Sequence, residues 1–190
     1  MSVADYTATE HLRDGRTIHI RAMRPADREG LLAVFARSSD QTRYRRFFGP
    51  KKALSPDELE RFLHVDFLSH VALAALVEGS DGQQVLAGGA RYVVCEAGSA
   101  ELAFTVDDRH QHLGIGTHLM RHLVLLAQGA GLQTLTAEVL ANNTPMLKLF
   151  ERAGLQIQIR HHDGIAHVTL GLSHKNPSRD QQSRNVNAAQ

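Results

Sequence analysis

The chain has 190 residues, of which 43% are hydrophobic, and this is enough for one globular domain with a sizeable core. Its 21 Lys and Arg residues balance 20 Asp and Glu residues, so the net charge of +1 gives no general attraction to nucleic acid or to a membrane. The single cysteine, Cys95, the absence of a signal-peptide pattern at the start and the absence of a long apolar run together predict a soluble, cytoplasmic domain.

Changes of periodicity divide the first half of the chain into strands and helices. Alternating apolar residues in "TIHIRAM" are typical of a half-buried strand. "SPDELERF" carries the clearest helix start, because Ser55 can cap the helix, Pro56 fits its first turn and Glu58 can close a capping box. In order, we predict a strand over 17–23, a helix over 24–38, a basic and aromatic connector over 43–52, a helix from Ser55, and strands over 71–77, 85–95 and 100–106 that form an antiparallel meander.

The second half is predicted to contain two further helices, a strand and a closing hairpin. Thr144 is expected to cap the second of these helices, with Pro145 as its first residue and Gly154 at its end. The pair Asp163-Gly164 is a hairpin signal. In order, we predict a helix with the apolar stripe Leu119, Met120, Leu123, Val124 and Ala127 that ends near Gly129 or Gly131, a strand over 134–140, a helix over 144–153, strands over 155–160 and 165–170, and a polar, disordered tail over 173–190.

The stretch "RHQHLGIGTHLMRHL", residues 109–123, places two glycines between a strand and an apolar helix. It lacks the third glycine of the dinucleotide motif G-x-G-x-x-G and the Gly-Lys-Ser/Thr of a Walker loop. Glycines before a helix still allow several backbone N–H groups to point outward together, and these groups add to the positive end of the helix dipole. The loop is therefore either an anion site suited to a pyrophosphate or a tight turn without a ligand.

Two motifs resemble those of the GCN5-related N-acetyltransferase (GNAT) family. Residues 111–116 read Q-x-x-G-x-G, the pyrophosphate-loop motif of that family, and residues 143–155 match the spacing of its second motif. Within the family, "TRYRRFF…LSPDELERF" and "AELAFTVDDRHQHLGIG" are similar to the catalytic domain of bacterial protein lysine acetyltransferases that modify acyl-CoA synthetases. The resemblance extends over residues 17–172 and favours coenzyme A as the ligand of the loop.

The resemblance implies a mixed α/β fold in a single GNAT domain, for which we expect the bounds 15–172. Its central, mostly antiparallel sheet would splay between the fourth and fifth strands, with helices on both faces and pantetheine between "AELAFTV" and "TLTAEVL". A helix-capping role is the alternative for Asn143. The implied cofactor-binding residues are Phe104, Thr105 and Val106 for pantetheine, Gln111, His112, Leu113, Gly114, Ile115, Gly116 and Thr117 for the pyrophosphate loop, and Asn143 at the head of the following helix.

Glu101 is the candidate catalytic residue. It faces away from Leu102 and Phe104 in its strand, so from the residues alone it is either exposed at a strand end or placed at a cleft. The resemblance implies a catalytic glutamate here, and the chemistry needs one, because a lysine amine with a pKa of about 10.4 is protonated at pH 7 and must lose a proton before attack. Backbone N–H groups near Phe104 would stabilise the oxyanion. Many family members carry a tyrosine acid where this chain has Phe150, so a solvent proton would reach the leaving thiolate.

The implied activity is transfer of an acetyl group from acetyl-CoA to an amine, and the expected acceptor is a lysine of a protein such as an acyl-CoA synthetase. Acetylation of a small-molecule amine and a non-catalytic acyl-CoA-binding module are the alternatives, and Glu101 favours an enzyme. We expect a monomer or homodimer. We expect no metal, because the spacing of His161, His162 and His167 matches no closed metal site. The basic cluster is interpreted as a solvated connector or as a contact for the 3′-phosphate or an acidic partner; it comprises Arg43, Arg45, Arg46, Lys51 and Lys52.

Overall fold

The computed structural model describes residues 2–79 and 82–172, so the predicted tail over 173–190 lies outside the described residues. The strands are β1 (Thr7–His11), β2 (Thr17–Ala22), β3 (His70–Glu78), β4 (Gln84–Glu96), β5 (Ser99–Val106), β6 (Thr134–Leu140), β7 (Gln156–His162) and β8 (Ile165–Gly171). The helices are α1 (Arg28–Arg37), α2 (Asp40–Phe47), α3 (Pro56–Leu63), α4 (Ile115–Gly129) and α5 (Thr144–Glu151), with short 3-10 turns at Val3–Asp5, Pro25–Asp27 and Asp108–His110.

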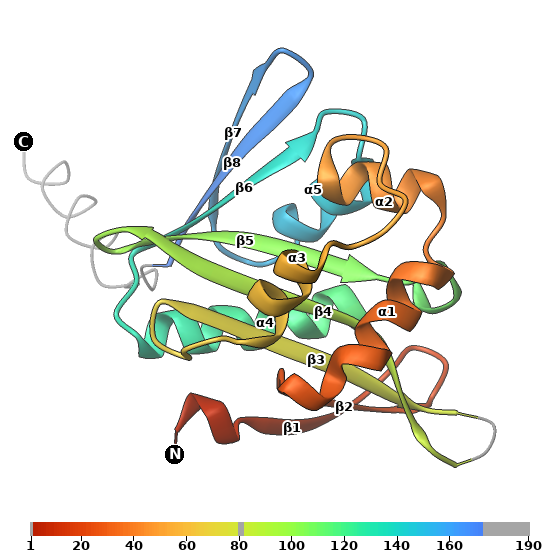
Figure 1. Ribbon diagram of the computed structural model, residues 1–190. Helices are drawn as coiled ribbons and strands as arrows, with labels where there is room; N and C mark the ends of the chain where they lie inside the picture. The colour runs from red at the N-terminus through yellow and green to blue at the C-terminus, as the bar shows by residue number, and fades with distance from the viewer. Residues whose placement is uncertain (1, 80–81, 173–190) are drawn as a thin grey trace, which may run out of the picture.

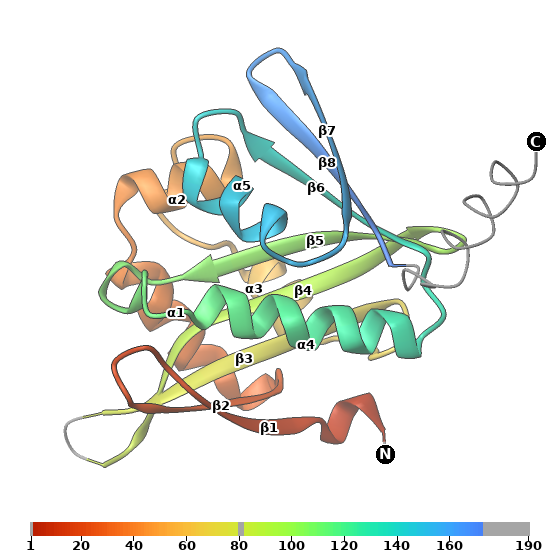
Figure 2. The same ribbon diagram turned by 180° about the vertical axis from the view of Figure 1, so that it is seen from behind.

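All eight strands form one sheet in the order β1-β2-β3-β4-β5-β6-β8-β7, and every neighbouring pair is antiparallel except β5 and β6. The mixed α/β fold and the mostly antiparallel sheet are as predicted. Helices α1 and α3 cover one face of the sheet, and α4 covers the other (Figures 1 and 2).

The strand β3 explains why both faces carry helices. Its interior is apolar along its whole length, so neither face can be left in water. Alternate side chains join two separate cores: Val71, Leu73, Ala75 and Val77 pack in the core that α4 closes, and Ala72, Ala74 and Leu76 pack in the core that α1 and α3 close. Burial in both layers fixes the register of the central strands.

Three local predictions were wrong. The connector over 43–52 overlaps the helix α2, which begins after Ser39, whose side chain accepts a hydrogen bond from the Thr42 N–H. The strand β1 was not predicted; it pairs with β2 and extends the sheet N-terminally of residue 15. Asn143, not Thr144, occupies the N-cap of α5. Side chains of α2 and β1 are exposed or half-buried, so neither element has an apolar stripe that sequence periodicity could detect.

The sheet opens between β5 and β6, which are the fourth and fifth of the predicted strands because β1 was not predicted. The two strands pair in parallel at three positions, Ser99 with Thr134, Ala100 with Leu135 and Glu101 with Thr136. Beyond Glu101 the strands separate, while β5 continues to Val106 and β6 to Leu140. This opening, visible at the centre of Figure 1, determines where the candidate site lies.

Candidate active site

A cleft of about 520 Å³ lies at the opening between β5 and β6. Its walls are the open part of β5, the loop before α4, the facing part of β6 and the first turns of α5. The predicted site residues that line it are Glu101, Phe104, Thr105, Val106, Gln111, His112, Gly114, Ile115, Gly116, Thr117 and Asn143. Leu113 does not line it; this side chain is half-buried and packs against the core.

The loop before α4 presents backbone amides to this cleft. Gly114 caps α4 with φ of +100°, and His112 also has a positive φ of +64°, so the backbone curls sharply before the helix. The first N–H groups of a helix have no acceptor within it, and α4 is a 15-residue helix whose first turn lines the cleft. The arrangement provides a site for an anion.

Gly116 behaves differently from Gly114. Its φ is not positive, and within the described part of the chain a Cβ placed on it would meet only Leu149, at 3.5 Å, which is an ordinary van der Waals contact. The fold itself therefore tolerates a side chain at this position. A larger side chain at Gly116 would extend into the cleft. Glycine at this position therefore leaves room for a ligand to approach the first turn of α4 closely.

Gln111 positions this loop through its side-chain amide. Its Nε2 donates to the carbonyl oxygen of Val106 at 3.0 Å and to the Thr42 hydroxyl at 3.2 Å. Gln111 thereby connects the loop both to the end of β5 and to α2. One predicted ligand group, the Val106 carbonyl, already accepts this hydrogen bond.

Two consecutive aspartates anchor the same loop on α1 and α2. Asp107 is fully buried, and its carboxylate accepts hydrogen bonds from Arg37 Nε on α1 and from His110 Nδ1, each at 2.7 Å. Asp108 accepts from the Ser39 N–H and from the Thr42 hydroxyl, the latter at 2.8 Å. The position of the loop therefore depends on both helices.

Glu101 stands at the last paired position before the two strands separate. Its side chain is exposed, and its register partners are Val93 on β4 and Thr136 on β6. Its carboxylate has no hydrogen bond or ion pair with any residue in the described ranges. The carboxylate is thus free to accept a proton from a molecule that enters the cleft.

Phe150 is buried, and it packs edge-on against Phe104 of β5, with ring centroids 6.1 Å apart and the planes at 72°. This contact stabilises the part of β5 that does not pair with β6. Asn143 caps α5 through its backbone, whose carbonyl accepts from the N–H groups of Met146 and Leu147. Its side chain makes no capping hydrogen bond within the described chain, so it remains available to the cleft.

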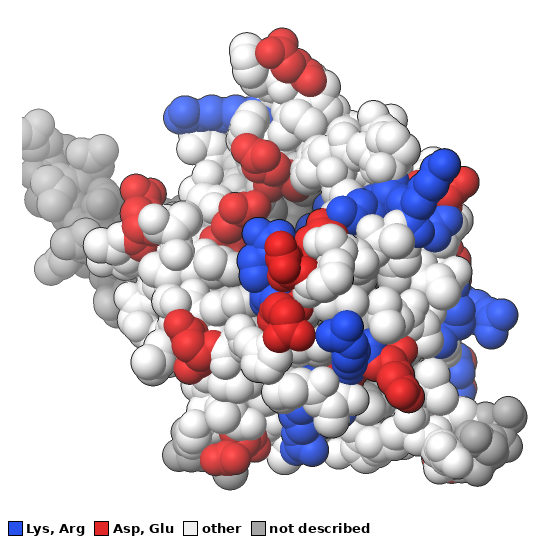
Figure 3. All heavy atoms as spheres, in the orientation of Figure 1, with Lys and Arg blue, Asp and Glu red and all other residues white. Residues whose placement is uncertain are grey.

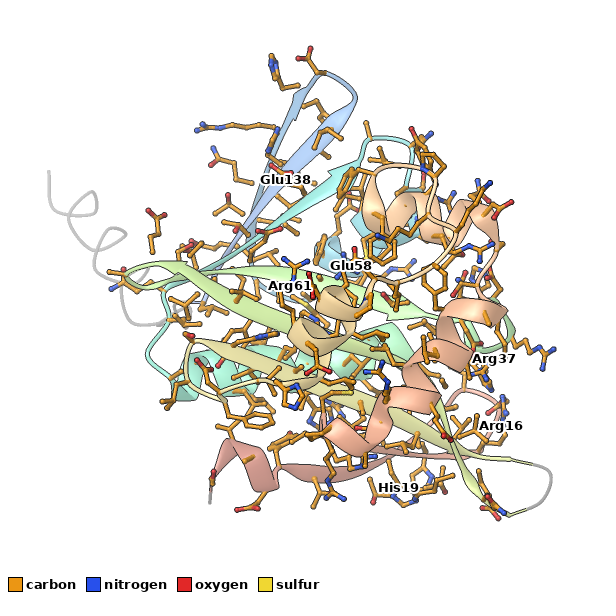
Figure 4. The ribbon with its side chains drawn as sticks, in the orientation of Figure 1. Arg16, His19, Arg37, Glu58, Arg61 and Glu138 are labelled. Carbon is orange, nitrogen blue, oxygen red and sulfur yellow. The ribbon has the colours of Figure 1, made fainter. Side chains whose placement is uncertain are left out.

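Sequence reasoning missed four charged residues that line the cleft, Arg13, Glu138, Lys148 and Arg152. Arg13 belongs to the turn between β1 and β2, and its N–H donates to the Leu113 carbonyl at 3.2 Å. Glu138 projects from β6 and lies 3.4 Å from His167 Nδ1 (Figure 4). No local signal could have found Arg13, because the hairpin that places it beside the loop was itself not predicted.

The basic cluster of the sequence does not act as one unit. Arg45 and Arg46 line the cleft. Arg43 pairs with Asp40 at 2.5 Å, and Lys51 pairs with Glu58 at 2.6 Å. On the face seen in Figure 3, Lys and Arg side chains are interspersed with Asp and Glu.

In residues 2–79 and 82–172, no group of three or more His, Cys, Asp or Glu side chains is placed to hold a metal ion. In the same part of the chain, no helix is long and apolar enough to cross a membrane.

The model of the Acetyltransferase (GNAT) family matches residues 38–155, and the chain belongs to this family. It is 38% identical to Acetyltransferase PA5475 of Pseudomonas aeruginosa over 141 residues, and this alignment covers 74% of this chain and 75% of the relative. It is 36% identical to Acetyltransferase Pat of Mycolicibacterium smegmatis over 148 residues, and this alignment covers 75% of this chain and 42% of Pat. The chain therefore spans less than half the length of Pat.

Solved structures agree with this assignment. The GNAT domain of S. lividans PAT is 33% identical and superposes with a TM-score of 0.78 over 87% of this chain and 96% of that domain. The yncA structure from Salmonella typhimurium with its cofactor acetyl-CoA shares the fold, with a TM-score of 0.67 at 16% identity over 84% of this chain and 96% of yncA. The protein is an acetyl-CoA-dependent acetyltransferase.

Proposed function

We propose that the protein transfers the acetyl group of acetyl-CoA to the side-chain amine of a lysine on another protein, such as an acyl-CoA synthetase. The observation that carries the proposal is the opening of the sheet at Glu101, which places a free carboxylate at the mouth of a cleft whose other end is the amide-lined loop before α4. The similarity to Pat and to the S. lividans PAT domain supports the protein acceptor.

The residues of the cleft fit coenzyme A. The amides at the head of α4 suit the pyrophosphate, and the space above Gly116 allows it to approach. The open edge of β5 at Phe104 and Thr105 suits the amide groups of pantetheine, which would pair with the backbone as a neighbouring strand does. Arg13 and Lys148 bring further positive charge to the rim. In this role Gln111 holds the loop in shape through Val106 and Thr42, and its amide need not touch the cofactor.

Glu101 would act as general base, directly or through a water molecule. It takes a proton from the lysine ammonium, the neutral amine attacks the thioester carbonyl, and backbone N–H groups near Phe104 stabilise the oxyanion. When the tetrahedral intermediate collapses, the C–S bond breaks, the thiolate of coenzyme A leaves and the attacking nitrogen releases its extra proton to solvent. A solvent proton neutralises that thiolate, because Phe150 has no hydroxyl to supply one.

The test is to incubate the full chain with acetyl-CoA and a purified AMP-forming acyl-CoA synthetase, and to measure lysine masses and synthetase activity. We expect acetylation of one or a few synthetase lysines, with loss of synthetase activity, and little acetylation by the Glu101→Gln variant. Rapid acetylation of a polyamine or an aminoglycoside, with every synthetase lysine unmodified, would replace the protein acceptor with a small amine. If coenzyme A binds but no acceptor reacts, the non-catalytic module is the better description.

A further inference from the structure

A second, smaller cavity of about 50 Å³ lies beside the cleft, between the sheet and the helices α1–α3. Its floor on β4 and β5 includes Gly89, Arg91, Ala103 and Thr105. A Cβ on Gly89 would lie 2.8 Å from the Leu73 carbonyl oxygen, so the fold requires glycine there and no side chain can fill the space. The volume is sufficient for a small polar group.

Two guanidinium groups face this cavity. Arg91 rises from the floor, and Arg46 reaches it from α2 while also lining the main cleft. Arg91 lies over the Phe62 ring at 4.4 Å, donates to the Phe62 carbonyl at 3.4 Å and lies 3.1 Å from His70 Nε2. Arg46 lies over the rings of Phe47 and Phe62, at 5.2 and 5.9 Å. The contacts of both arginines in the structure are therefore with aromatic rings, an imidazole and a carbonyl.

Neither arginine forms an ion pair with any residue that the structure describes. The nearby Glu58 carboxylate is already bonded to the Lys51 ammonium at 2.6 Å and to the Ser55 N–H at 2.7 Å. Burial, together with the smaller effect of the positive charge of Arg46, lowers the pKa of Arg91 to about 9. Burial also lowers the pKa of Arg46, although Glu101 and Glu58 oppose this shift. Two partly desolvated guanidinium groups that have no ion-pair partner among the described residues are costly to hold together, and an anion in contact with both would offset that cost.

The register of the sheet places Arg91 close to Glu101, the candidate base. Arg91 pairs with Ala103 and Val93 pairs with Glu101, so Arg91 and Glu101 are diagonal neighbours on one face of β4 and β5. Diagonal neighbours are typically about 7–8 Å apart. On this face of β4 and β5, Glu101 therefore provides a negative charge, and Arg46 and Arg91 provide positive charge at the cavity beside it. A molecule with an ammonium group and an anion a few atoms apart matches both ends.

We propose that Arg46 and Arg91 bind a carboxylate that the acceptor carries close to its reactive amine. This inference rests on the proposed function, because it assumes that the amine reacts beside Glu101. Carboxylates form paired hydrogen bonds with guanidinium groups, which would fix the orientation of the acceptor. The carboxylate comes either from an acidic side chain next to an acceptor lysine or from the α-carboxylate of a free amino acid.

The experiment uses the full chain, acetyl-CoA and acceptors in matched pairs. One arm compares end-blocked pentapeptides that contain a central lysine flanked by glutamate or by glutamine, and the other compares free amino acids with their carboxamides. We expect kcat/KM to be about 10–100-fold higher for the carboxylate member of at least one pair, as a hydrogen bond between charged groups supplies. In Arg46→Gln the ratio of kcat/KM between the carboxylate and the neutral member should fall to within about threefold of unity, because the loss falls mainly on the carboxylate member; Arg46→Lys should keep part of the preference.

Arg61→Gln is the matched control, because Arg61 is an exposed guanidinium on α3 that does not line the cavity (Figure 4). Melting temperatures and the Kd for coenzyme A of each variant show whether folding and cofactor binding are intact. Equal losses with charged and neutral acceptors in Arg46→Gln would mean that the arginine only packs against Phe47 and Phe62, and would overturn the proposal. The absence of any carboxylate preference in the unaltered protein, including the case in which no acceptor reacts, would also overturn it.

The two arms separate this inference from the proposed function. Inert lysine peptides together with acetylated free amino acids would reject the protein acceptor and leave the carboxylate site in place. Reactive lysine peptides without any effect of the flanking glutamate would support the protein acceptor and reject the carboxylate site.

Discussion

The Gln111 side chain donates a hydrogen bond from Nε2 to the Thr42 hydroxyl, 3.2 Å away, and thereby joins the amide-lined loop to α2. The same hydroxyl donates to the Asp108 carboxylate at 2.8 Å. Thr42 thus links a helix that lines the cavity of Arg46 to the loop proposed for coenzyme A. Together with the contacts of Asp107 to Arg37 and of Asp108 to Ser39, this residue couples the loop to the helices that border the cavity of Arg46.

Thr42→Val keeps the shape of the side chain but removes both hydrogen bonds. We expect a loss of about 1–3 kcal/mol in the free energy of unfolding, because one of the bonds ends on a charged carboxylate. The Kd for coenzyme A should rise severalfold, because the loop loses a support. Thr7→Val, at an exposed position of β1, is the control for the substitution itself. Chemical denaturation and calorimetric titration measure both quantities, and an unchanged Kd would show that the link has no role in cofactor binding.

Gly116→Glu should abolish binding of coenzyme A, since the side chain would enter the cleft and repel the pyrophosphate. The fold should survive, because the added Cβ meets Leu149 at an ordinary 3.5 Å. Gly129→Glu, at the other end of α4, is a matched control, because a Cβ there meets nothing within 4 Å in the described chain. Calorimetry on folded variants is the measurement. An affinity in Gly116→Glu close to that of the unaltered protein would remove the loop from the cofactor site.

Glu101→Gln keeps the size of the side chain and removes its basicity. If Glu101 is the general base, kcat should fall by about 10²–10⁴ while the Kd for coenzyme A is unchanged. Turnover is measured by release of the coenzyme A thiol at saturating acceptor. A near-normal rate would shift attention to Glu138, the second carboxylate that lines the cleft.

Local chemistry made the start of α3 predictable, whereas the register of the strands could not be predicted from the sequence. The capping box at Ser55 and Glu58 is present as predicted, because its hydrogen bonds span only three residues. The helix α2 carries polar residues without an apolar stripe and could not be detected by periodicity. The proximity of Arg91 to Glu101 follows from strand pairing between β4 and β5, which a single sequence does not specify residue by residue.

Phe150→Tyr tests whether thiolate protonation limits the reaction. We expect kcat to stay within a fewfold of the original value, because a thiolate is a good leaving group and solvent can protonate it. The added hydroxyl enters a position that is 1% exposed, so the free energy of unfolding should fall by about 1–3 kcal/mol. Phe150→Ala should cost about 3–5 kcal/mol through lost packing. A large rate gain in the tyrosine variant would mean that an acid at this position had been limiting.

The stability of the protein should decrease as the pH falls below about 6.5, in part because of His122 on α4. This side chain is buried, and it lies between the Tyr6 hydroxyl and the Glu10 carboxylate, with Nε2 3.1 Å from the Glu10 oxygen. Burial lowers the pKa of His122 from the ordinary 6.5, although Glu10 opposes the shift. The unfolded chain therefore binds the proton more readily than the folded chain does. The contribution of the neutral imidazole is fully present above pH 6.5 and is lost as the pH falls through the lower pKa of the folded state.

Equilibrium denaturation at pH 8 and at pH 5.5 measures this loss. In His122→Gln the decrease in the free energy of unfolding between the two pH values should be smaller than in the unaltered protein, because the titrating group is gone. His64→Gln is the control, since His64 is 60% exposed and lies at the end of α3, away from β1. Its pH dependence should match that of the unaltered protein. If His122→Gln loses as much stability on acidification as the unaltered protein does, other groups are responsible and the contact between Tyr6, His122 and Glu10 is pH-independent over this range.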